Sequence, residues 1–175
     1  MKDEARAARC RELKLILTDV DGVLTDGRVL FFENGGEATS FHVRDGLALV
    51  MAKQAGLRTG LLSGRRSELV RRRAEDLGLD VVVQGASDKA AAFARILERE
   101  GLQAHEVAYM GDDVSDLPVL IDAGISAAPA DAPFEVRAQV FMVTDAPGGM
   151  GCLREFVEAI LRDRGDWERL LATRA

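Results

Sequence analysis

The 175-residue sequence predicts an α/β fold, a doubly wound parallel sheet of the Rossmann type with one inserted β-hairpin. Two observations carry this prediction. Short apolar runs alternate with helix-like segments along most of the chain, which is the pattern of parallel strands joined by crossover helices. One segment, residues 27–43, breaks the alternation and is typical of two short strands around a turn. The length suits one domain, which we expect to cover residues 1–175.

Most of the predicted strands are apolar at both odd and even positions, as strands buried on both faces of a sheet should be. They are LKLILTD (13–19), LRTGLLSG (57–64), VVVQG (81–85), VAYMGDD (107–113), ISAAP (125–129) and VFMVTD (140–145). The predicted helices between them open on Asp or Ser and close on Gly, the residue types of helix caps. They cover 45–56, 66–78, 87–101 and 115–124, and a last helix is expected at 153–165, within a C-terminal segment 152–175.

The inserted segment, GRVLFFENGGEATSFHV (27–43), predicts two short strands around ENGGE. It carries Phe31, Phe32 and Phe41, which have no obvious cover within the chain. A two-stranded ribbon is only marginally stable by itself. We therefore expect this hairpin to pack against a partner subunit.

Composition narrows the class of protein. Apolar residues make up 47% of the chain and charged residues 30%, which are values of a globular protein with a sizeable core. The net charge of −6 argues against a nucleic-acid partner. Cys10 and Cys152 form no CxxC motif, so a disulfide framework is not expected and a reducing compartment fits. No apolar stretch approaches the length of a membrane span and the first 12 residues are highly charged, so we expect a cytoplasmic protein without a membrane partner.

Polar residues follow the carboxyl ends of four successive predicted strands, where open parallel sheets bind their ligands. They are Asp19 and Asp21, then Ser63, then Lys89 just past the third strand, then Asp112 and Asp113. Four strands therefore deliver acids, one hydroxyl and one cation to the same edge of the sheet.

The two acids after the first strand point to a division of labour. Asp19 and Asp21 are two residues apart and project to the same side of an extended chain. Neighbouring carboxylates raise each other's pKa, which suits an ionised Asp19 beside an Asp21 that carries a proton. Asp19 and Asp112 offer few oxygen ligands, which fits Mg²⁺ better than Ca²⁺. With only His42 and His105 in the chain, a zinc or di-iron site is not expected.

Phosphoryl transfer is the chemistry that uses these groups together, because its transition state needs positioning and charge neutralisation. Asp19 would attack phosphorus to form an aspartyl-phosphate. Asp21 would protonate the leaving oxygen and then activate water. The motifs of rival mechanisms are missing from the sequence: there is no GxxxxGK[ST] loop, no C-x5-R and no GxSxG elbow.

These residues resemble the four ordered motifs of the haloacid dehalogenase superfamily of phosphatases. The motifs are DVDGVLTDG, LLSGR, Lys89 and GDDVSD. Further details are similar to the small, capless, tetrameric 3-deoxy-D-manno-octulosonate 8-phosphate phosphatases. Those details are TDG, VRDG (43–46), SGR followed by VRRRAEDLG, and GGMGCLRE (148–155). The departures are His42 where Asn is expected before VRDG, Ser63 in place of Thr, and GCLRE in place of GAVRE.

The resemblance implies a role for each matching residue. Asp19 is implied as nucleophile and metal ligand, Asp21 as acid/base with its backbone carbonyl on Mg²⁺, and Asp112 as the third protein ligand. Ser63 and Lys89 are implied to hold the phosphoryl oxygens. Asp113 and Asp116 are implied to orient the site from behind. The expected substrate contacts are His42, Val43, Arg44, Asp45, Gly46, Arg65, Arg73 and Lys89. The hairpin is implied to form the core of a homotetramer, whose neighbouring subunits replace the missing cap.

The function expected from this resemblance is Mg²⁺-dependent hydrolysis of a sugar-acid phosphate, foremost 3-deoxy-D-manno-octulosonate 8-phosphate in lipopolysaccharide precursor synthesis. A phosphatase for a 9-carbon, sialic-acid-type sugar phosphate and a broad phosphatase are alternatives. A signalling receiver module has similar groups, but there the Lys follows strand 5, whereas Lys89 follows strand 3. A non-catalytic tetrameric domain is a third possibility, against which the intact Asp19, Asp21, Lys89 and Asp112 argue.

Structural explanations compete with several of these assignments. Ser63 is also a possible helix N-cap, as are Asp113 and Asp116. A cation in the first turn of a helix opposes the helix dipole, so Lys89 invites a functional reason, with a solvated surface side chain as the alternative. The glycines of 148–151 form either a plain loop or a mobile flap over the site.

Overall fold

The computed structural model, which describes residues 2–172, contains six parallel strands in one sheet. They are β1 (Leu15–Thr18), β4 (Arg58–Ser63), β5 (Val81–Gln84), β6 (Val107–Met110), β7 (Ile125–Ala128) and β8 (Met142–Val143). Their order across the sheet is β5-β4-β1-β6-β7-β8. The chain therefore winds outward from β1 in both directions, as in a doubly wound fold. The predicted fold class is confirmed, and each of the six predicted strands is present.

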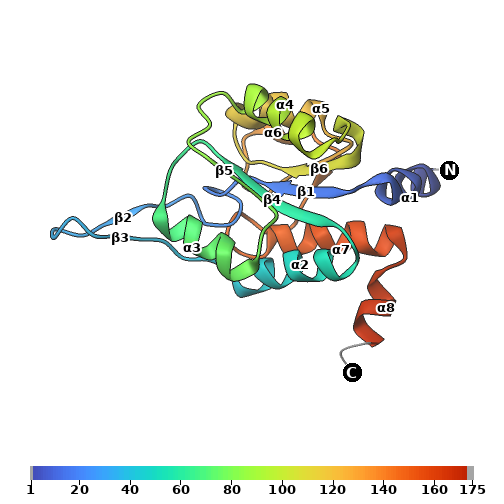
Figure 1. Ribbon diagram of the computed structural model, residues 1–175, viewed down its shortest axis with the longest axis horizontal. Helices are drawn as coiled ribbons and strands as arrows, with labels where there is room; N and C mark the ends of the chain where they lie inside the picture. The colour runs from blue at the N-terminus through green and yellow to red at the C-terminus, as the bar shows by residue number, and fades with distance from the viewer. Residues whose placement is uncertain (1, 173–175) are drawn as a thin grey trace.

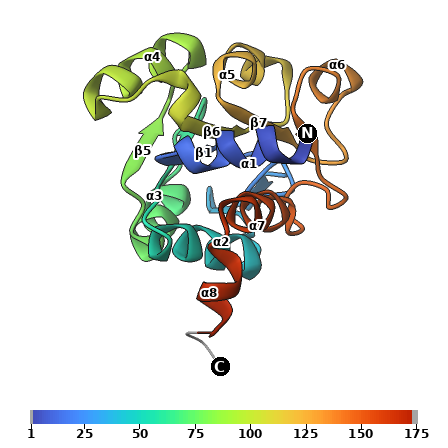
Figure 2. The ribbon, with the colours of Figure 1, turned by 90° about the vertical axis from the view of Figure 1, so that its right-hand side faces the viewer.

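Helices cover both faces of this sheet (Figures 1 and 2). They are α1 (Lys2–Glu12), α2 (Val43–Gln54), α3 (Glu68–Leu77), α4 (Lys89–Glu100), α5 (Leu117–Asp122), α6 (Phe134–Arg137), α7 (Cys152–Arg164) and α8 (Trp167–Ala172), with 3-10 turns η1 (Ala104–Glu106) and η2 (Val114–Asp116). Figure 1 shows α4, α5 and α6 on one face and α2, α3 and α7 on the other. Within residues 2–172, no helix combines the length and the hydrophobicity needed to cross a membrane.

The central strand β1 contributes to two separate hydrophobic cores. Ile16 packs in a cluster with Leu49 of α2, on the face covered by α2 and α7. Leu17 points to the opposite face, into a cluster with Phe93 of α4. Alternate residues of a strand point to opposite faces, so both must be apolar when both faces are covered. This explains why Leu15, Ile16 and Leu17 of β1 are all apolar and why the end of the strand is rigidly placed.

Helix caps account for the boundaries that were predicted well and for one that was not. The side chain of Asp88 accepts a hydrogen bond of 2.9 Å from the amide of Ala91 and starts α4, and Gly101 in the left-handed conformation ends it. Helix α2 begins at Val43, two residues before the predicted start, with His42 at the N-cap position. Asp45 therefore lies inside the first turn of α2, and not at its cap.

Three helices were not predicted, namely α1, α6 and α8. Helix α1 consists almost entirely of charged residues and alanine, and of its described side chains only Cys10 is buried. It lies at the end of the sheet opposite the hairpin (Figure 1). Helix α6 has one turn, and α8 is held through Trp167, whose ring lies 4.8 Å from the guanidinium carbon of Arg154. Helix α1 is stabilised by contacts with α7, far along the chain, and α6 and α8 are too short to leave a clear periodic signal.

The inserted hairpin consists of β2 (Leu30–Phe31) and β3 (Glu37–Ala38), paired antiparallel and projecting from the molecule (Figure 1). Phe31 is 76% exposed and Phe32 is 55% exposed, as expected of apolar residues without cover. The expectation for Phe41 was wrong, because its ring packs against the core beside α2 and lies 5.8 Å from the guanidinium carbon of Arg73. No cap domain covers the sheet within residues 2–172, as predicted.

Candidate active site

A cleft of about 200 Å³ opens at the carboxyl ends of the central strands. Its walls are formed by Asp19, Asp21, Ser63, Gly64, Arg65, Lys89, Asp112, Asp113 and Ser115. Asp19 follows β1 and Asp112 follows β6, the two neighbouring strands at which the direction of winding reverses. Ligands of doubly wound sheets bind at this reversal. The structure thus brings together the acids, the hydroxyl and the cation that the sequence placed at strand ends, and adds Gly64 and Ser115.

Lys89 is buried between two carboxylates. Its Nζ lies 3.1 Å from Oδ2 of Asp19 and 2.5 Å from Oδ1 of Asp116, and the residue is 7% exposed. The surface-lysine explanation is therefore wrong. Burial by itself would lower the pKa of Lys89, but the two carboxylates outweigh this effect and raise the pKa above its ordinary value. The ammonium group remains charged inside the cleft.

Asp116 is fully buried and both of its oxygens accept hydrogen bonds. Oδ1 accepts from Lys89 and from the hydroxyl of Tyr109. Oδ2 accepts from the amides of Asp112 and Asp113, each at 3.3 Å. Oxygens of Asp116, Asp19 and Asp112 lie within 4.8 Å of one another, but those of Asp116 are already engaged. Asp116 is therefore placed to hold the lysine and the loop after β6.

Asp19 and Asp112 form a buried acidic pair. Burial, together with the charge of Asp116, raises the pKa of Asp19 to about 6. Burial and the charge of Asp19 raise the pKa of Asp112 to about 8. Oδ1 of Asp112 is buried without a hydrogen-bond partner among the described residues. Two carboxylates that resist ionisation, one with an unpaired oxygen, form a site to which a divalent cation would supply the missing charge.

The backbone around this pair is shaped to leave room for an ion. Gly22 has a φ of +96°, and a Cβ at this position would lie 2.0 Å from Oδ2 of Asp112. Any side chain here would displace that carboxylate. Few protein oxygens and an open, water-accessible side are the features that favour Mg²⁺ over Ca²⁺. The donors present, carboxylates of Asp19 and Asp112, therefore fit the expected Mg²⁺.

Asp21 lies on the outer side of the cleft and is held by Arg65. Nη1 of Arg65 lies 3.1 Å from Oδ1 of Asp21, and Nη2 lies 3.1 Å from Oε1 of Glu37 on the hairpin strand β3. Ser63 is buried at the end of β4, where its Oγ accepts a hydrogen bond of 3.2 Å from the amide of Arg65. Ser63 does not cap a regular helix, and because its Oγ acts as the acceptor in this bond, its hydroxyl proton remains available to a ligand in the cleft. Glu37 was not anticipated, since its partner is 28 residues away in the sequence.

Asp113 is exposed, and its Oδ1 accepts a hydrogen bond of 2.7 Å from the amide of Val114. This is the N-cap of η2. Asp113 thus shapes the turn that carries Asp116, while its own carboxylate remains at the rim of the cleft.

Most of the expected substrate contacts lie outside the cleft of their own chain. Val43 is 78% exposed and shares a separate hollow with Phe41 and Arg73. Gly46 packs against Arg73, since a Cβ on Gly46 would lie 2.3 Å from a guanidinium nitrogen. Arg44 faces a third cavity. Of this group of expected contacts, Arg65 and Lys89 are the ones that line the cleft.

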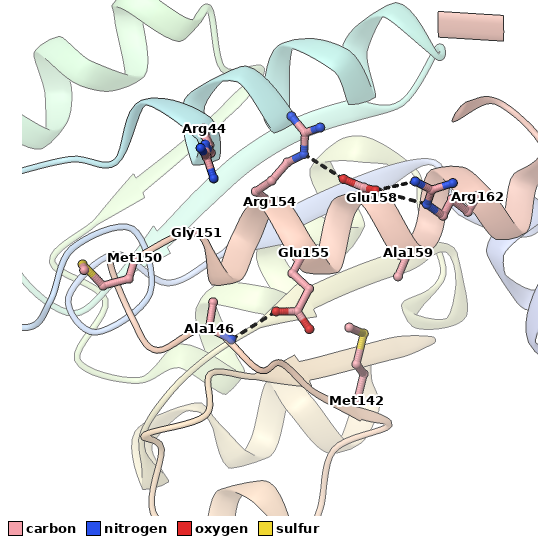
Figure 3. A pocket seen from close by; sticks show the side chains of 10 residues that line it. All are labelled: Arg44, Met142, Ala146, Met150, Gly151, Arg154, Glu155, Glu158, Ala159 and Arg162. Atoms are coloured by element: carbon pink, nitrogen blue, oxygen red, sulfur yellow. Dashed lines mark hydrogen bonds and ion pairs between the residues drawn. The ribbon is translucent and has the colours of Figure 1, made fainter. Parts of the chain in front are cut away.

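The cavity beside Arg44 has a volume of about 450 Å³ and lies along α7 (Figure 3). Its charged groups are largely paired with each other. Glu158 accepts hydrogen bonds from the guanidinium groups of Arg154 at 3.1 Å and Arg162 at 2.7 Å. Glu155 accepts a hydrogen bond of 3.1 Å from the amide of Ala146. The cavity therefore lacks the convergent acids and the buried cation of the cleft.

Asp45 is buried and turned into the protein. Its Oδ1 accepts a hydrogen bond of 2.7 Å from the amide of Arg154, in the first turn of α7. Burial raises the pKa of Asp45, and the hydrogen bond from Arg154 partly opposes this effect. Nδ1 of His42 lies 4.0 Å from its other oxygen. Through this hydrogen bond the carboxylate of Asp45 links α2 to α7.

The glycine-rich segment 148–151 packs against the loop that follows β1. The amide of Gly149 donates to the carbonyl of Val23 at 2.9 Å, and Sγ of Cys152 donates to the same carbonyl at 3.4 Å. The amide of Gly148 donates to Asp131 at 2.9 Å. In this arrangement the segment is bonded to the loop that carries Asp21.

Comparison with known proteins gives concordant matches. Residues 36–124 match the model of the haloacid dehalogenase-like hydrolase family. The 3-deoxy-D-manno-octulosonate 8-phosphate phosphatase KdsC of Haemophilus influenzae is 41% identical over 157 residues, which are 90% of this chain and 87% of the relative. The KdsC of Escherichia coli K12 is 37% identical over 158 residues, covering 90% of this chain and 84% of that protein.

Solved structures agree with these sequence matches. The 3-deoxy-D-manno-octulosonate 8-phosphate phosphatase of Moraxella catarrhalis, in complex with magnesium ion, phosphate ion and KDO, gives a TM-score of 0.95 at 33% identity, covering 98% of this chain and 99% of that chain. The cobalt-bound phosphatase of Haemophilus influenzae gives a TM-score of 0.87 at 41% identity, covering 91% of this chain and 93% of that chain.

Proposed function

Because this chain belongs to the haloacid dehalogenase-like hydrolase family, we propose that it hydrolyses 3-deoxy-D-manno-octulosonate 8-phosphate to the free sugar acid and inorganic phosphate. The reaction depends on Mg²⁺ and serves lipopolysaccharide precursor synthesis. The observation that carries the proposal is the cleft in which Lys89 contacts Asp19 beside Oδ1 of Asp112, an oxygen without a hydrogen-bond partner among the described residues. The similarity over 90% of the chain to a phosphatase of this substrate supports the choice of sugar acid.

In the first step, an oxygen of Asp19 attacks phosphorus and the bond between phosphorus and the ester oxygen breaks. Asp21 gives its proton to that leaving oxygen, which becomes the hydroxyl of the sugar acid. The phosphoryl group is then attached to Asp19. Arg65 holds Asp21 at 3.1 Å, at the outer side of the cleft where a leaving group would depart.

In the second step, water attacks phosphorus, its proton returns to Asp21, and the bond to Asp19 breaks to release phosphate. Lys89 and the hydroxyl of Ser63 hold the phosphoryl oxygens through both steps and offset their negative charge. The carboxylates of Asp19 and Asp112 and the backbone carbonyl of Asp21 would hold Mg²⁺, which supplies further charge neutralisation when bound.

We also propose where the enzyme works and how its subunits assemble. Residues 1–175 form one catalytic domain that works in the cytoplasm as a homotetramer, without a nucleic-acid or membrane partner. Support comes from the exposed Leu30, Phe31 and Phe32 on the hairpin, which need a partner surface. In the assembly, His42, Val43, Arg44 and Arg73 of a neighbouring copy lie around the substrate, whereas the buried Asp45 and Gly46 shape the start of α2 that carries Val43 and Arg44.

A broader phosphatase is the second candidate, because the cleft is open and no cap within residues 2–172 restricts the alcohol. Steady-state kinetics with Mg²⁺ separate the two. The panel consists of the 8-phosphate of the octulosonate, a 9-carbon sialic-acid-type phosphate and hexose phosphates. We expect the highest kcat/KM for the octulosonate ester. Equal values for hexose phosphates would reject the specific assignment and leave a general phosphatase.

A further inference from the structure

The hydroxyl of Tyr109 has no part in the mechanism above, yet one atom separates it from the lysine of the site. Tyr109 lies on β6 and is 0% exposed. Its hydroxyl donates a hydrogen bond to Oδ1 of Asp116. The same oxygen accepts from Nζ of Lys89 at 2.5 Å. A single carboxylate oxygen therefore joins the phenol to the ammonium group in the cleft.

Resting on the proposed phosphatase function, we propose that Tyr109 is a positioning residue for the reaction. Its hydrogen bond fixes the carboxylate of Asp116, which in turn sets the place of Lys89 relative to the nucleophile Asp19. Tyr109 touches neither the phosphoryl group nor the reacting oxygen.

Lys89 needs such support because a lysine side chain is long and flexible and lies between two competing anions. Nζ is 3.1 Å from Asp19 and 2.5 Å from Asp116. If Asp116 turned away, the ammonium group would pair with Asp19 alone and mask the nucleophile. The bonds from the amides of Asp112 and Asp113 to Oδ2 are long, at 3.3 Å each. The phenol holds the other oxygen, so the carboxylate plane is fixed from both sides.

The ring of Tyr109 is well suited to act as a fixed mount. It belongs to the same buried cluster as Phe93 of α4 and Val119 of α5, and close-packed cores allow little movement. A tyrosine in such a cluster needs a partner for its hydroxyl, and here the partner is charged. Burial, with the charge of Asp116, raises the pKa of Tyr109 well above its ordinary value, so the phenol remains a donor.

The first test is Tyr109→Phe in the full chain with Mg²⁺ and a phosphate monoester. The ring and its packing remain, and only the hydrogen bond to a charged group is lost. We expect kcat to fall about tenfold to one-hundredfold, the equivalent of such a bond, with KM nearly unchanged because Lys89 acts mainly on charge in the transition state. Ile96→Val is the matched control: it loosens the same cluster, two turns along α4 from Lys89, and removes no polar group. An unchanged kcat in Tyr109→Phe, or an equal loss in Ile96→Val, would overturn the proposal.

The second test needs no turnover and so separates this proposal from the proposed function. Tyr109 is the single tyrosine of the sequence, so 3-fluorotyrosine gives one ¹⁹F resonance. We expect this resonance to move in Lys89→Met, because the shared oxygen of Asp116 loses its second donor, and to remain in place in Ile96→Val. An unchanged ¹⁹F chemical shift in Lys89→Met would show that the phenol and the lysine are not coupled. If the unsubstituted protein released no phosphate, the function would fail while this measurement still decided the coupling.

Discussion

The ammonium group of Lys89 lies 3.1 Å from Oδ2 of Asp19, joining the first residue of α4 to the first residue after β1. The pair is buried, so each charge depends on the other and on Asp116 for compensation. A cation at a helix start is unfavourable by about 0.3–1 kcal/mol. The two carboxylates offset that cost, and the site obtains a cation next to its nucleophile.

Replacing Lys89 by Met should therefore lower both stability and turnover. Removing one member of a buried ion pair costs about 3–5 kcal/mol, because the remaining charges are uncompensated. Urea unfolding of the metal-free protein measures this loss. Lys53→Met is the matched control, since Lys53 is partly exposed and pairs with Asp80 at 3.3 Å, and an exposed pair contributes about 0–1 kcal/mol. Equal losses in the two variants would contradict the buried role of Lys89.

Asp19→Asn should abolish phosphate release, because an amide does not act as the nucleophile. The melting temperature should remain close to that of the unsubstituted protein, because Lys89 keeps its ion pair with Asp116 and the repulsion between Asp19 and Asp112 is relieved. Asp122→Asn, at the exposed end of α5, makes the same chemical change away from the cleft and should keep full activity. Sustained turnover by Asp19→Asn in a phosphate-release assay would rule out covalent catalysis by this residue.

The metal-free protein should lose stability as the pH rises from about 4 to about 8. The pKa of Asp19 is raised to about 6 and that of Asp112 to about 8, whereas both are near 3.8 in the unfolded chain. Between these values the folded state binds more protons than the unfolded state, so its advantage disappears with increasing pH. Mg²⁺ requires ionised ligands, and its stabilising effect should therefore be larger at pH 8 than at pH 6.

Thermal unfolding at both pH values, with EDTA and with Mg²⁺, measures this dependence. Asp112→Asn should flatten the pH profile of the metal-free protein and remove most of the effect of Mg²⁺. A metal-free protein that becomes more stable toward pH 8 would be incompatible with the acidic pair as described.

Gly22→Ala should weaken metal binding. The new Cβ would lie 2.0 Å from Oδ2 of Asp112, in a backbone conformation with φ +96° that alanine rarely adopts. Gly35→Ala is a matched control, because Gly35 has φ +81° but open space around it. We expect the Mg²⁺ concentration for half-maximal activity to rise in Gly22→Ala alone. Similar titrations for both variants would mean that backbone strain, and not the site, is responsible.

The double substitution Phe31→Ser with Phe32→Ser should reduce the oligomer to smaller species while the sheet remains folded. Both side chains are exposed and belong to neither buried cluster. Light scattering gives the mass and circular dichroism the fold. Phe41→Ser should have the opposite pattern, lowering the melting temperature because its ring packs on the core. An unchanged mass for the double variant would reject assembly through the hairpin.

Local pattern was sufficient for much of the fold. The first three residues of β1 are all apolar, and α4 has both its caps, Asp88 and Gly101, in the sequence. Helix α2 was placed two residues late because His42 is not a usual N-cap and makes no side-chain cap bond. Helix α1 depends on contacts with α7, far along the chain, and α8 is short, so periodicity reveals neither helix.

The candidate site also contains residues that were predicted from the sequence and residues that were not. Asp19, Lys89 and Asp112 meet because strand ends meet, which follows from topology. The hydroxyl of Tyr109 was missed because it sits among apolar residues of β6 and is explained only by Asp116 on the next turn. The inward orientation of Asp45 depends on where α7 begins, which no local signal near residue 45 encodes.

The hairpin has a consequence for how such an enzyme can change over evolutionary time. Leu30, Phe31 and Phe32 contribute to neither buried cluster, and β2 and β3 pair only with each other among the described strands. Mutations of these three side chains leave the folding of the sheet intact and act on the assembly of subunits. These exposed side chains, and with them the contacts between subunits, can therefore change faster in evolution than the residues of the catalytic cleft.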